Sequence, residues 1–139
     1  MFRFDTLTRT FIMNTVKVAE RAALLPGDIS RESCIRLLAQ EAAELWFPGM
    51  EAQLADSTLA RECEEPTYLG RGLAVPHARV EGLPGAAVYV ARTAGISWPE
   101  EAADCIALLC VPADRPELHL QLLSHIVRWR MKGGTLQLA

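Results

Sequence analysis

Residues 70–77, which read Gly-Arg-Gly-Leu-Ala-Val-Pro-His, hold the side chain with the most promising chemistry in this sequence. They place His77 at the end of a short apolar segment that contains a proline and follows two glycines. An imidazole can attack a phosphorus centre when it is neutral and its second nitrogen donates to a fixed acceptor. Pro76 fixes its own φ and biases Val75 toward extended backbone. The segment therefore predicts a histidine held in one orientation and partly exposed.

Residue types alone permit a second interpretation of each candidate. A histidine after an apolar run commonly ends a strand and bonds to the backbone without any catalytic role. On residue types alone, Arg61 is better explained as a solvated charge paired with a neighbouring glutamate. His119 lies in an apolar stretch with helical spacing, so it either faces the core or donates to a ligand. Local chemistry leaves these alternatives open.

The order of the motifs along the chain resembles one protein family. Arg61-Glu62 precedes the glycine-rich segment that ends at His77, and Glu117-Leu118-His119 follows a later apolar run. This order resembles the enzyme IIA domain of the fructose/mannitol type in the bacterial phosphoenolpyruvate-dependent sugar phosphotransferase system, including its nitrogen-regulatory branch. The resemblance extends from about residue 30 to residue 131.

The resemblance implies roles for three residues. His77 corresponds to the histidine that takes a phosphoryl group from phospho-HPr or a paralogue, and His119 corresponds to the second active-site histidine of the family. Arg61 corresponds to the arginine beside the phosphohistidine, where a guanidinium can bind phosphoryl oxygens in a bidentate manner. In the family the group then passes to a cysteine of a IIB partner in sugar uptake, or its presence acts as a regulatory signal.

The function implied is therefore that of a phosphocarrier, a phosphotransferase that works through a phosphohistidine with no cofactor and no metal. Its expected partners are an HPr-like phosphocarrier protein and a IIB domain or a regulatory target. Two alternatives stay open: a regulatory protein-binding module of the nitrogen-type branch, and a degenerate IIA-like domain without phosphotransfer. The state of self-association stays open too.

Composition limits the remaining classes. A chain of 139 residues, 50% of them hydrophobic, is long enough for one domain with a sizeable core. Its net charge of −3 and the absence of a Lys/Arg stripe argue against nucleic-acid binding. The longest apolar run, residues 106–111, is too short to cross a bilayer, and the first residues lack the apolar region of a signal peptide. We expect a soluble cytoplasmic protein without membrane insertion.

The cysteines and the remaining histidine do not suggest a metal site. The four cysteines have no Cys-x-x-Cys spacing, so we expect small core residues rather than a zinc site or disulfides (Cys34, Cys63, Cys105 and Cys110). His119 and His125 are six residues apart, which would turn them to different faces of a helix. We expect His125 to be structural.

Helical spacing predicts three helices. The first covers about residues 31–47, with Ser30 as N-cap and an apolar stripe on its buried face (Ile35, Leu38, Ala42 and Leu45). The second covers about residues 50–60 and ends near Arg61. The third begins after Asp114, with Pro116 in its first turn, and places His119 near its N-terminus.

Apolar runs at residues 73–75, 86–91 and 105–111 predict strands, the last one central and covered on both faces. We expect an α/β fold, a mixed sheet flanked by helices on both faces, formed by residues 26–139 as a single IIA-like domain. Residues 1–25 are expected to form an atypical helical N-terminal extension, and the C-terminus is expected to be shortened relative to the family. Residues 95–99 are expected to form a loop, and leucines around His77 a docking rim (Leu69, Leu73 and Leu83).

Overall fold

A computed structural model of the chain describes residues 16–133. Three helices and six strands follow one another in a mixed α/β order. In chain order these are β1 (Val16–Glu20), α2 (Arg31–Trp46), α3 (Glu51–Glu64), β2 (Tyr68–Gly70), β3 (Leu73–Ala74), β4 (His77–Val80), β5 (Ala86–Ser97), β6 (Ala102–Pro112) and α4 (Glu117–Gly133). The expected helices are thus present, and the expected strands all belong to one sheet.

The sheet is mixed, as the sequence predicted, with β6 at its centre. Its order is β1-β5-β6-β3-β2, with β4 also paired to β6. The long strands β5 and β6 form an antiparallel hairpin, while β3 and β4 both run parallel to β6 along its other edge. Residues 105–111 are accordingly buried on both faces, which explains why this run is apolar throughout.

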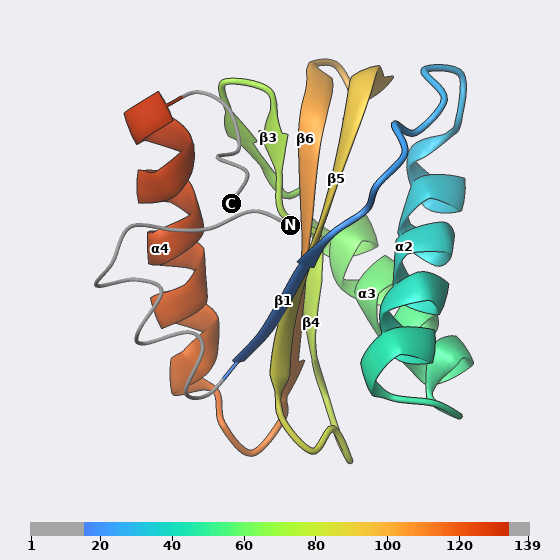
Figure 1. Cartoon of the computed structure of the whole chain (residues 1–139), viewed down its shortest axis with the longest axis vertical. Coiled ribbons are helices and arrows are strands. Elements are labelled where there is room, and N and C mark those ends of the chain that lie inside the picture. The colour runs from blue at the N-terminus through green and yellow to red at the C-terminus, as the bar shows by residue number, and fades with distance from the viewer. Residues whose placement is uncertain (1–15, 134–139) are drawn as a thin grey trace.

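Helices cover both faces of the sheet (Figure 1). Helices α2 and α3 pack on one face and α4 packs on the other. Alternate residues of β5 and β6 therefore enter two separate apolar clusters, one shared with α2 and α3 and one shared with α4. On the α4 side the cluster includes Leu118, Leu122 and Ile126, which recur at helical spacing.

One interrupted strand presents His77. Residues Leu73 and Ala74 pair with β6, and His77 to Val80 resume the pairing in the same register beyond Pro76. Proline has no N–H to donate to the ladder, which explains why the pairing is broken here. The sequence predicted strand only up to Val75; the chain recovers strand geometry at His77 because the parallel neighbour β6 continues, and the Leu109 N–H donates to the Pro76 carbonyl at 3.0 Å.

Helix α2 agrees with its sequence signals except at one position. The Ser30 side chain accepts a hydrogen bond from the Ser33 N–H at 3.0 Å, as an N-cap does. Ile35, Leu38 and Ala42 are fully buried. Leu45 is 57% exposed, so the prediction that it completes the buried stripe was wrong, because Ala39 and Ala43 occupy the face toward the sheet instead.

The expectation of a helical N-terminal extension is wrong for residues 16–20. They form β1, which pairs in parallel with β5 from Val16 opposite Ala86 to Glu20 opposite Val90. The side chains of Val16 and Val18 both contact the apolar cluster on the α4 side, as alternate residues of a strand do. The partly helical spacing of the apolar residues in this segment led to the wrong prediction. Residues 1–15 and 134–139 lie outside the described residues, so the remainder of the extension and the expected shortening of the C-terminus stay predictions.

Four local expectations also need correction. Residues 95–97 continue β5, so the expected loop is reduced to the turn around Trp98, whose ring is fully buried. Cys63 lies exposed on α3, whereas the other three cysteines are buried as expected. Helix α3 extends to Glu64, which places Arg61 inside its last turn. Helix α4 begins at Glu117, so Pro116 immediately precedes the helix instead of lying in its first turn.

None of the helices among residues 16–133 combines the length and the apolar character needed to cross a membrane.

Candidate functional site

His77 begins β4, and its ring is oriented by the backbone just before it. Its Nδ1 lies 2.7 Å from the Val75 carbonyl oxygen. A carbonyl can only accept a hydrogen bond, so Nδ1 carries the proton and Nε2 keeps its lone pair. The Nε2 atom is buried and makes no hydrogen bond within the described part of the chain. This is the tautomer that a nucleophilic Nε2 requires.

His119 lies in the first turn of α4 and faces His77. The centroids of the two rings are 4.3 Å apart and the ring planes are tilted by 36°. The Nε2 of His119 is also buried and unpartnered among residues 16–133. Two polar atoms without partners thus lie in one small space, an arrangement that costs free energy unless a ligand uses them.

His77 itself is only 7% exposed, which differs from the partial exposure expected from the sequence. The cause is the neighbouring imidazole, because the His119 ring packs against that of His77. His119 is the more exposed ring of the pair. The His119 ring therefore covers part of the His77 ring.

Both histidines are biased toward the neutral form. Burial lowers the pKa of His77, and the positive charges of Arg61 and Arg79 act in the same direction, while the hydrogen bond to Val75 and the charge of Glu62 oppose them. Burial likewise lowers the pKa of His119 to about 4, with contributions from His77, Arg79 and Arg61. At neutral pH each ring consequently has one nitrogen with a free lone pair.

Arg61 lies near these histidines, in the last turn of α3. Its charge acts on both rings. Its Nη1 donates to the Glu65 backbone carbonyl at 3.1 Å. This bond caps the end of the helix and replaces the pairing with a neighbouring glutamate side chain that was the alternative interpretation of Arg61. The remaining donors of the guanidinium are available for an anion.

Arg79 is a second cation at the site. It is exposed on β4 and shares a sheet face with His77, because side chains two residues apart on a strand point the same way. Its charge acts on His77 and His119. Within residues 16–133 it makes no hydrogen bond or ion pair. Two guanidinium groups thus favour a negatively charged ligand between them and the histidines.

Glu62 is a residue of the site region that sequence reasoning missed. Its side chain is 3% exposed and accepts hydrogen bonds from Thr67 and Trp98. A signal was available, because Leu54 and Thr58 precede it at intervals of four residues and share the buried face of α3. A carboxylate on such a stripe predicts a buried partner network.

The other candidates play no part in this geometry. His125 is not part of the histidine pair. Its Nδ1 lies 3.0 Å from Nη2 of Arg128, on the same helix. Among residues 16–133, no three His, Cys, Asp or Glu side chains are grouped as a metal site would need. Leu73 and Leu83 are buried, so the expected docking rim is wrong for both; Leu69, at 46% exposed, is the one of the three that a partner could contact.

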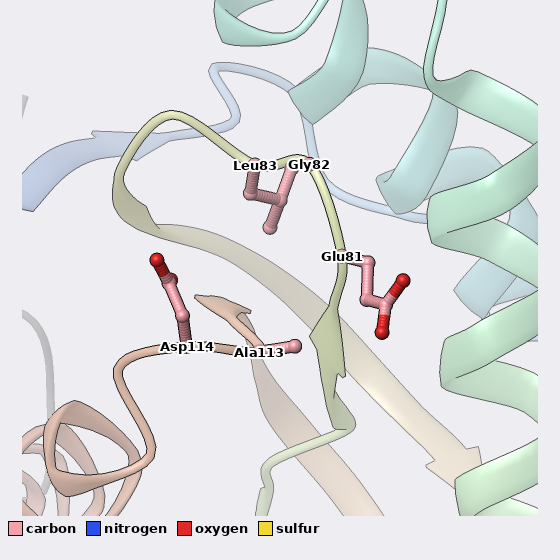
Figure 2. A pocket seen from close by; sticks show the side chains of 5 residues that line it. All are labelled: Glu81, Gly82, Leu83, Ala113 and Asp114. Atoms are coloured by element: carbon pink, nitrogen blue, oxygen red, sulfur yellow. The ribbon is translucent and has the colours of Figure 1, made fainter.

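A separate hollow of about 410 Å³ lies where the loop after β4 meets the turn after β6 (Figure 2). Glu81, Gly82 and Leu83 line one side, and Ala113 and Asp114 line the other. The two carboxylates would repel a phosphoryl group. Since neither histidine lines this hollow, it is not the candidate site.

Comparison with known proteins places the chain in a family. The sequence model of the family described as "Phosphoenolpyruvate-dependent sugar phosphotransferase system, EIIA 2" matches residues 25–137. The 2-O-alpha-mannosyl-D-glycerate-specific EIIABC component of the phosphotransferase system from Escherichia coli is 34% identical over 122 residues. That match takes in 81% of this chain but only 18% of the longer relative.

Two solved structures have the same fold. The nitrogen regulatory protein IIA-Ntr from Neisseria meningitidis matches with a TM-score of 0.63 and 23% identity, over 82% of this chain and 80% of its own. A chain from the complex of mannitol enzyme IIA and phosphorylated enzyme IIB from Escherichia coli matches with a TM-score of 0.61 and 19% identity, over 92% of this chain and 81% of its own. From the extent of the family match, this chain belongs to the EIIA 2 family of the phosphoenolpyruvate-dependent sugar phosphotransferase system.

Proposed function

We propose that this protein is a phosphocarrier that accepts a phosphoryl group on Nε2 of His77 from the phosphohistidine of an HPr-like protein. The observation that supports the proposal best is the state of the His77 ring. One nitrogen donates to Val75 at 2.7 Å, and the other is unpartnered among the described residues and faces His119. Membership in the EIIA 2 family of the phosphotransferase system supports phosphoryl transfer as the class of reaction.

The transfer itself needs one bond to form and one to break. The Nε2 lone pair of His77 forms the new N–P bond while the P–N bond to the donor histidine breaks, and that electron pair returns to the donor nitrogen. The Nδ1 proton stays on His77. The phosphorylated ring then carries positive charge, which the Val75 carbonyl and the charge of Glu62 stabilise.

His119 has two tasks in this proposal. Its ring packs against His77, so it must turn aside before a donor phosphorus can approach Nε2. Once turned, a neutral imidazole can donate one N–H to a phosphoryl oxygen without adding a positive charge beside Arg61 and Arg79. Arg61 and Arg79 offer further donors to the equatorial oxygens. Positioning and charge therefore account for most of the expected rate.

The direct test is phosphoryl transfer to the purified protein from phosphoenolpyruvate, enzyme I and HPr, followed by intact mass. We expect one added phosphoryl group in the wild type and none in His77→Ala. His125→Ala is a matched control, because it removes an imidazole from the same helix as His119 and should leave the added mass unchanged. Uptake that persists in His77→Ala would refute the assignment of the acceptor.

The downstream partner is a separate part of the proposal. A solved relative forms a complex with phosphorylated enzyme IIB, and another is a nitrogen regulatory protein. We favour a IIB cysteine as the acceptor, in sugar uptake, because a relative that is 34% identical over 122 residues is the 2-O-alpha-mannosyl-D-glycerate-specific component. Incubation of the phosphorylated protein with purified IIB domains tests this. A stable phosphohistidine that no IIB domain discharges would instead support regulatory output.

A further inference from the structure

Glu62 is a buried carboxylate whose two oxygens are both occupied. Oε1 accepts from the Thr67 hydroxyl at 2.6 Å, and Oε2 accepts from the Thr67 N–H at 3.1 Å. Oε2 also accepts from Nε1 of Trp98 at 2.9 Å and lies 3.5 Å from Nη1 of Arg31. A single side chain thus ties together α2, the end of α3, the segment before β2 and the turn after β5.

A continuous path of hydrogen bonds leads from this carboxylate to the reactive ring. Thr67, held at both its N–H and its hydroxyl by Glu62, accepts from the Val75 N–H at 3.0 Å through its own carbonyl. The Val75 carbonyl then accepts from Nδ1 of His77 at 2.7 Å. Val75, whose carbonyl selects the His77 tautomer, is therefore bonded through its N–H to Thr67, which Glu62 holds in place.

The same side chain also affects Arg61. The two residues are adjacent in the last turn of α3, and Arg61 donates to the Glu65 carbonyl just beyond that turn. Because Glu62 anchors the following segment through Thr67, it determines where this part of the backbone lies. One buried carboxylate thus sets the position of the cation and the orientation of the imidazole.

We propose that Glu62 is a positioning residue for phosphoryl transfer: through Thr67 and Val75 it holds His77 in the Nδ1–H tautomer and keeps Arg61 beside it. The inference rests on the proposed function for its catalytic consequence. Its structural part, the tautomer of His77, can be measured without any phosphoryl donor.

Substitutions at Glu62 separate the hydrogen bonds from the charge. Glu62→Gln keeps the shape; its amide oxygen can replace Oε2, and the Thr67 hydroxyl can turn to accept from the amide nitrogen. Glu62→Ala removes every bond. The matched control is Glu41→Ala. Glu41 also accepts two side-chain hydrogen bonds, from the Tyr89 hydroxyl at 2.7 Å and from Nε of the half-buried Arg21 at 3.0 Å, on elements that do not lead to His77.

The first measurement is the nitrogen-15 spectrum of the His77 ring in the unphosphorylated protein. We expect the wild type and Glu62→Gln to show the Nδ1–H tautomer alone, and Glu62→Ala to show a mixture of both tautomers. Glu41→Ala should resemble the wild type even where its stability is lowered. A pure Nδ1–H signal in folded Glu62→Ala would overturn the proposal, whatever the protein does with phosphoryl donors.

The second measurement is the rate of phosphoryl uptake. Glu62→Ala should lower the maximal rate by about 10- to 100-fold with little change in the apparent KM for phospho-HPr, as misorientation of a reacting group does. Glu62→Gln should restore the rate to within about threefold of the wild type. If the wild type accepts no phosphoryl group, the proposed function fails while the tautomer measurement still decides the role of Glu62.

A milder variant covers the case in which Glu62→Ala does not fold. Thr67→Val keeps the volume of the side chain and removes only the hydroxyl that bonds to Oε1. We expect faster hydrogen exchange of the Val75 N–H and a detectable second tautomer of His77. Exchange and tautomer identical to the wild type would contradict the path through Thr67.

Discussion

The imidazole rings of His77 and His119 lie with their centroids 4.3 Å apart, and neither Nε2 has a partner among residues 16–133. Two facing histidines without a metal ligand set among the described residues are unusual as a purely structural pair, since each buried nitrogen lacks a hydrogen bond. A phosphoryl group bonded to Nε2 of His77 would use that lone pair, and its oxygens could accept a hydrogen bond from His119. The chemistry expected from this pair leads to the first prediction.

His119→Ala should have opposite effects on two reactions of His77. Loss of the covering ring exposes Nε2, so carbethoxylation of His77 by diethyl pyrocarbonate should become faster. Loss of the N–H donor should slow phosphoryl uptake by about 100-fold, the scale found when one donor to a developing charge is removed. Peptide mapping by mass spectrometry and the uptake rate measure the two effects. If both reactions slow together, His119 does not cover Nε2.

Arg79→Gln should lower the rate of phosphoryl uptake by about 3- to 10-fold at low salt, because the lost charge is exposed and screened. The same substitution should raise the pKa of His77 and of His119, since the charge of Arg79 lowers both. Arg36→Gln is the control, because it removes an equal charge from an exposed position on α2 that pairs with Glu32 and Asp56. Equal losses in the two variants would mean that net charge, not position, sets the rate.

Much of the framework could be predicted from the sequence. The Ser30 cap and the apolar spacing of α2 are local signals, and the structure confirms them except at Leu45. The apolar run at 105–111 correctly indicated a central strand. These signals suffice because each depends on neighbours within a few residues.

The site could be predicted only in part. The spacing of residues along the sequence does not predict the contact between His119 and His77, because this contact depends on how α4 packs across the sheet. Only the family resemblance placed the two histidines in one site. The burial of Glu62 was missed because its partners Thr67 and Trp98 come from later segments. β1 was missed because its partner β5 lies far along the chain, and pairing, not local propensity, makes it a strand.

The low pKa values of the histidine pair predict how stability depends on pH. Unfolding returns both rings to water, where imidazole binds a proton near its ordinary pKa of about 6.5. His119 has a folded pKa of about 4, and that of His77 is also lowered. Between these pH values the unfolded chain binds more protons than the folded chain, so stability falls as pH decreases through this window.

Urea unfolding between pH 7 and pH 5 measures this dependence, above the range in which most carboxylates titrate. We expect the free energy of unfolding to decrease steadily across it, and His119→Gln to decrease less because one of the two shifted groups is gone. A pH dependence that is unchanged in His119→Gln would show that His119 titrates normally in the folded protein.

Gly72 should tolerate substitution far less well than Gly70, although both have positive φ, +78° and +97° respectively. A Cβ on Gly70 meets nothing within 4 Å, so Gly70→Ala should cost only the backbone strain, about 1–2 kcal/mol. A Cβ on Gly72 would lie 3.0 Å from Cγ of Asp104 and closer still to its Oδ1. That carboxylate cannot simply move away, because Nη2 of Arg130 donates to it at 2.6 Å.

Gly72→Ala should therefore disturb the ion pair between Arg130 and Asp104, which joins the end of α4 to β6. Arg130 is 8% exposed and also donates to the Arg71 carbonyl at 2.8 Å, so displacing Asp104 leaves a nearly buried cation short of a partner. We expect a loss of about 2–4 kcal/mol in urea unfolding, the strain plus the disturbed ion pair. Asp104→Ala in the Gly72→Ala background should recover part of it, since the clash is gone. Equal stability of Gly70→Ala and Gly72→Ala would show that strain alone acts at both glycines and that Asp104 yields without cost.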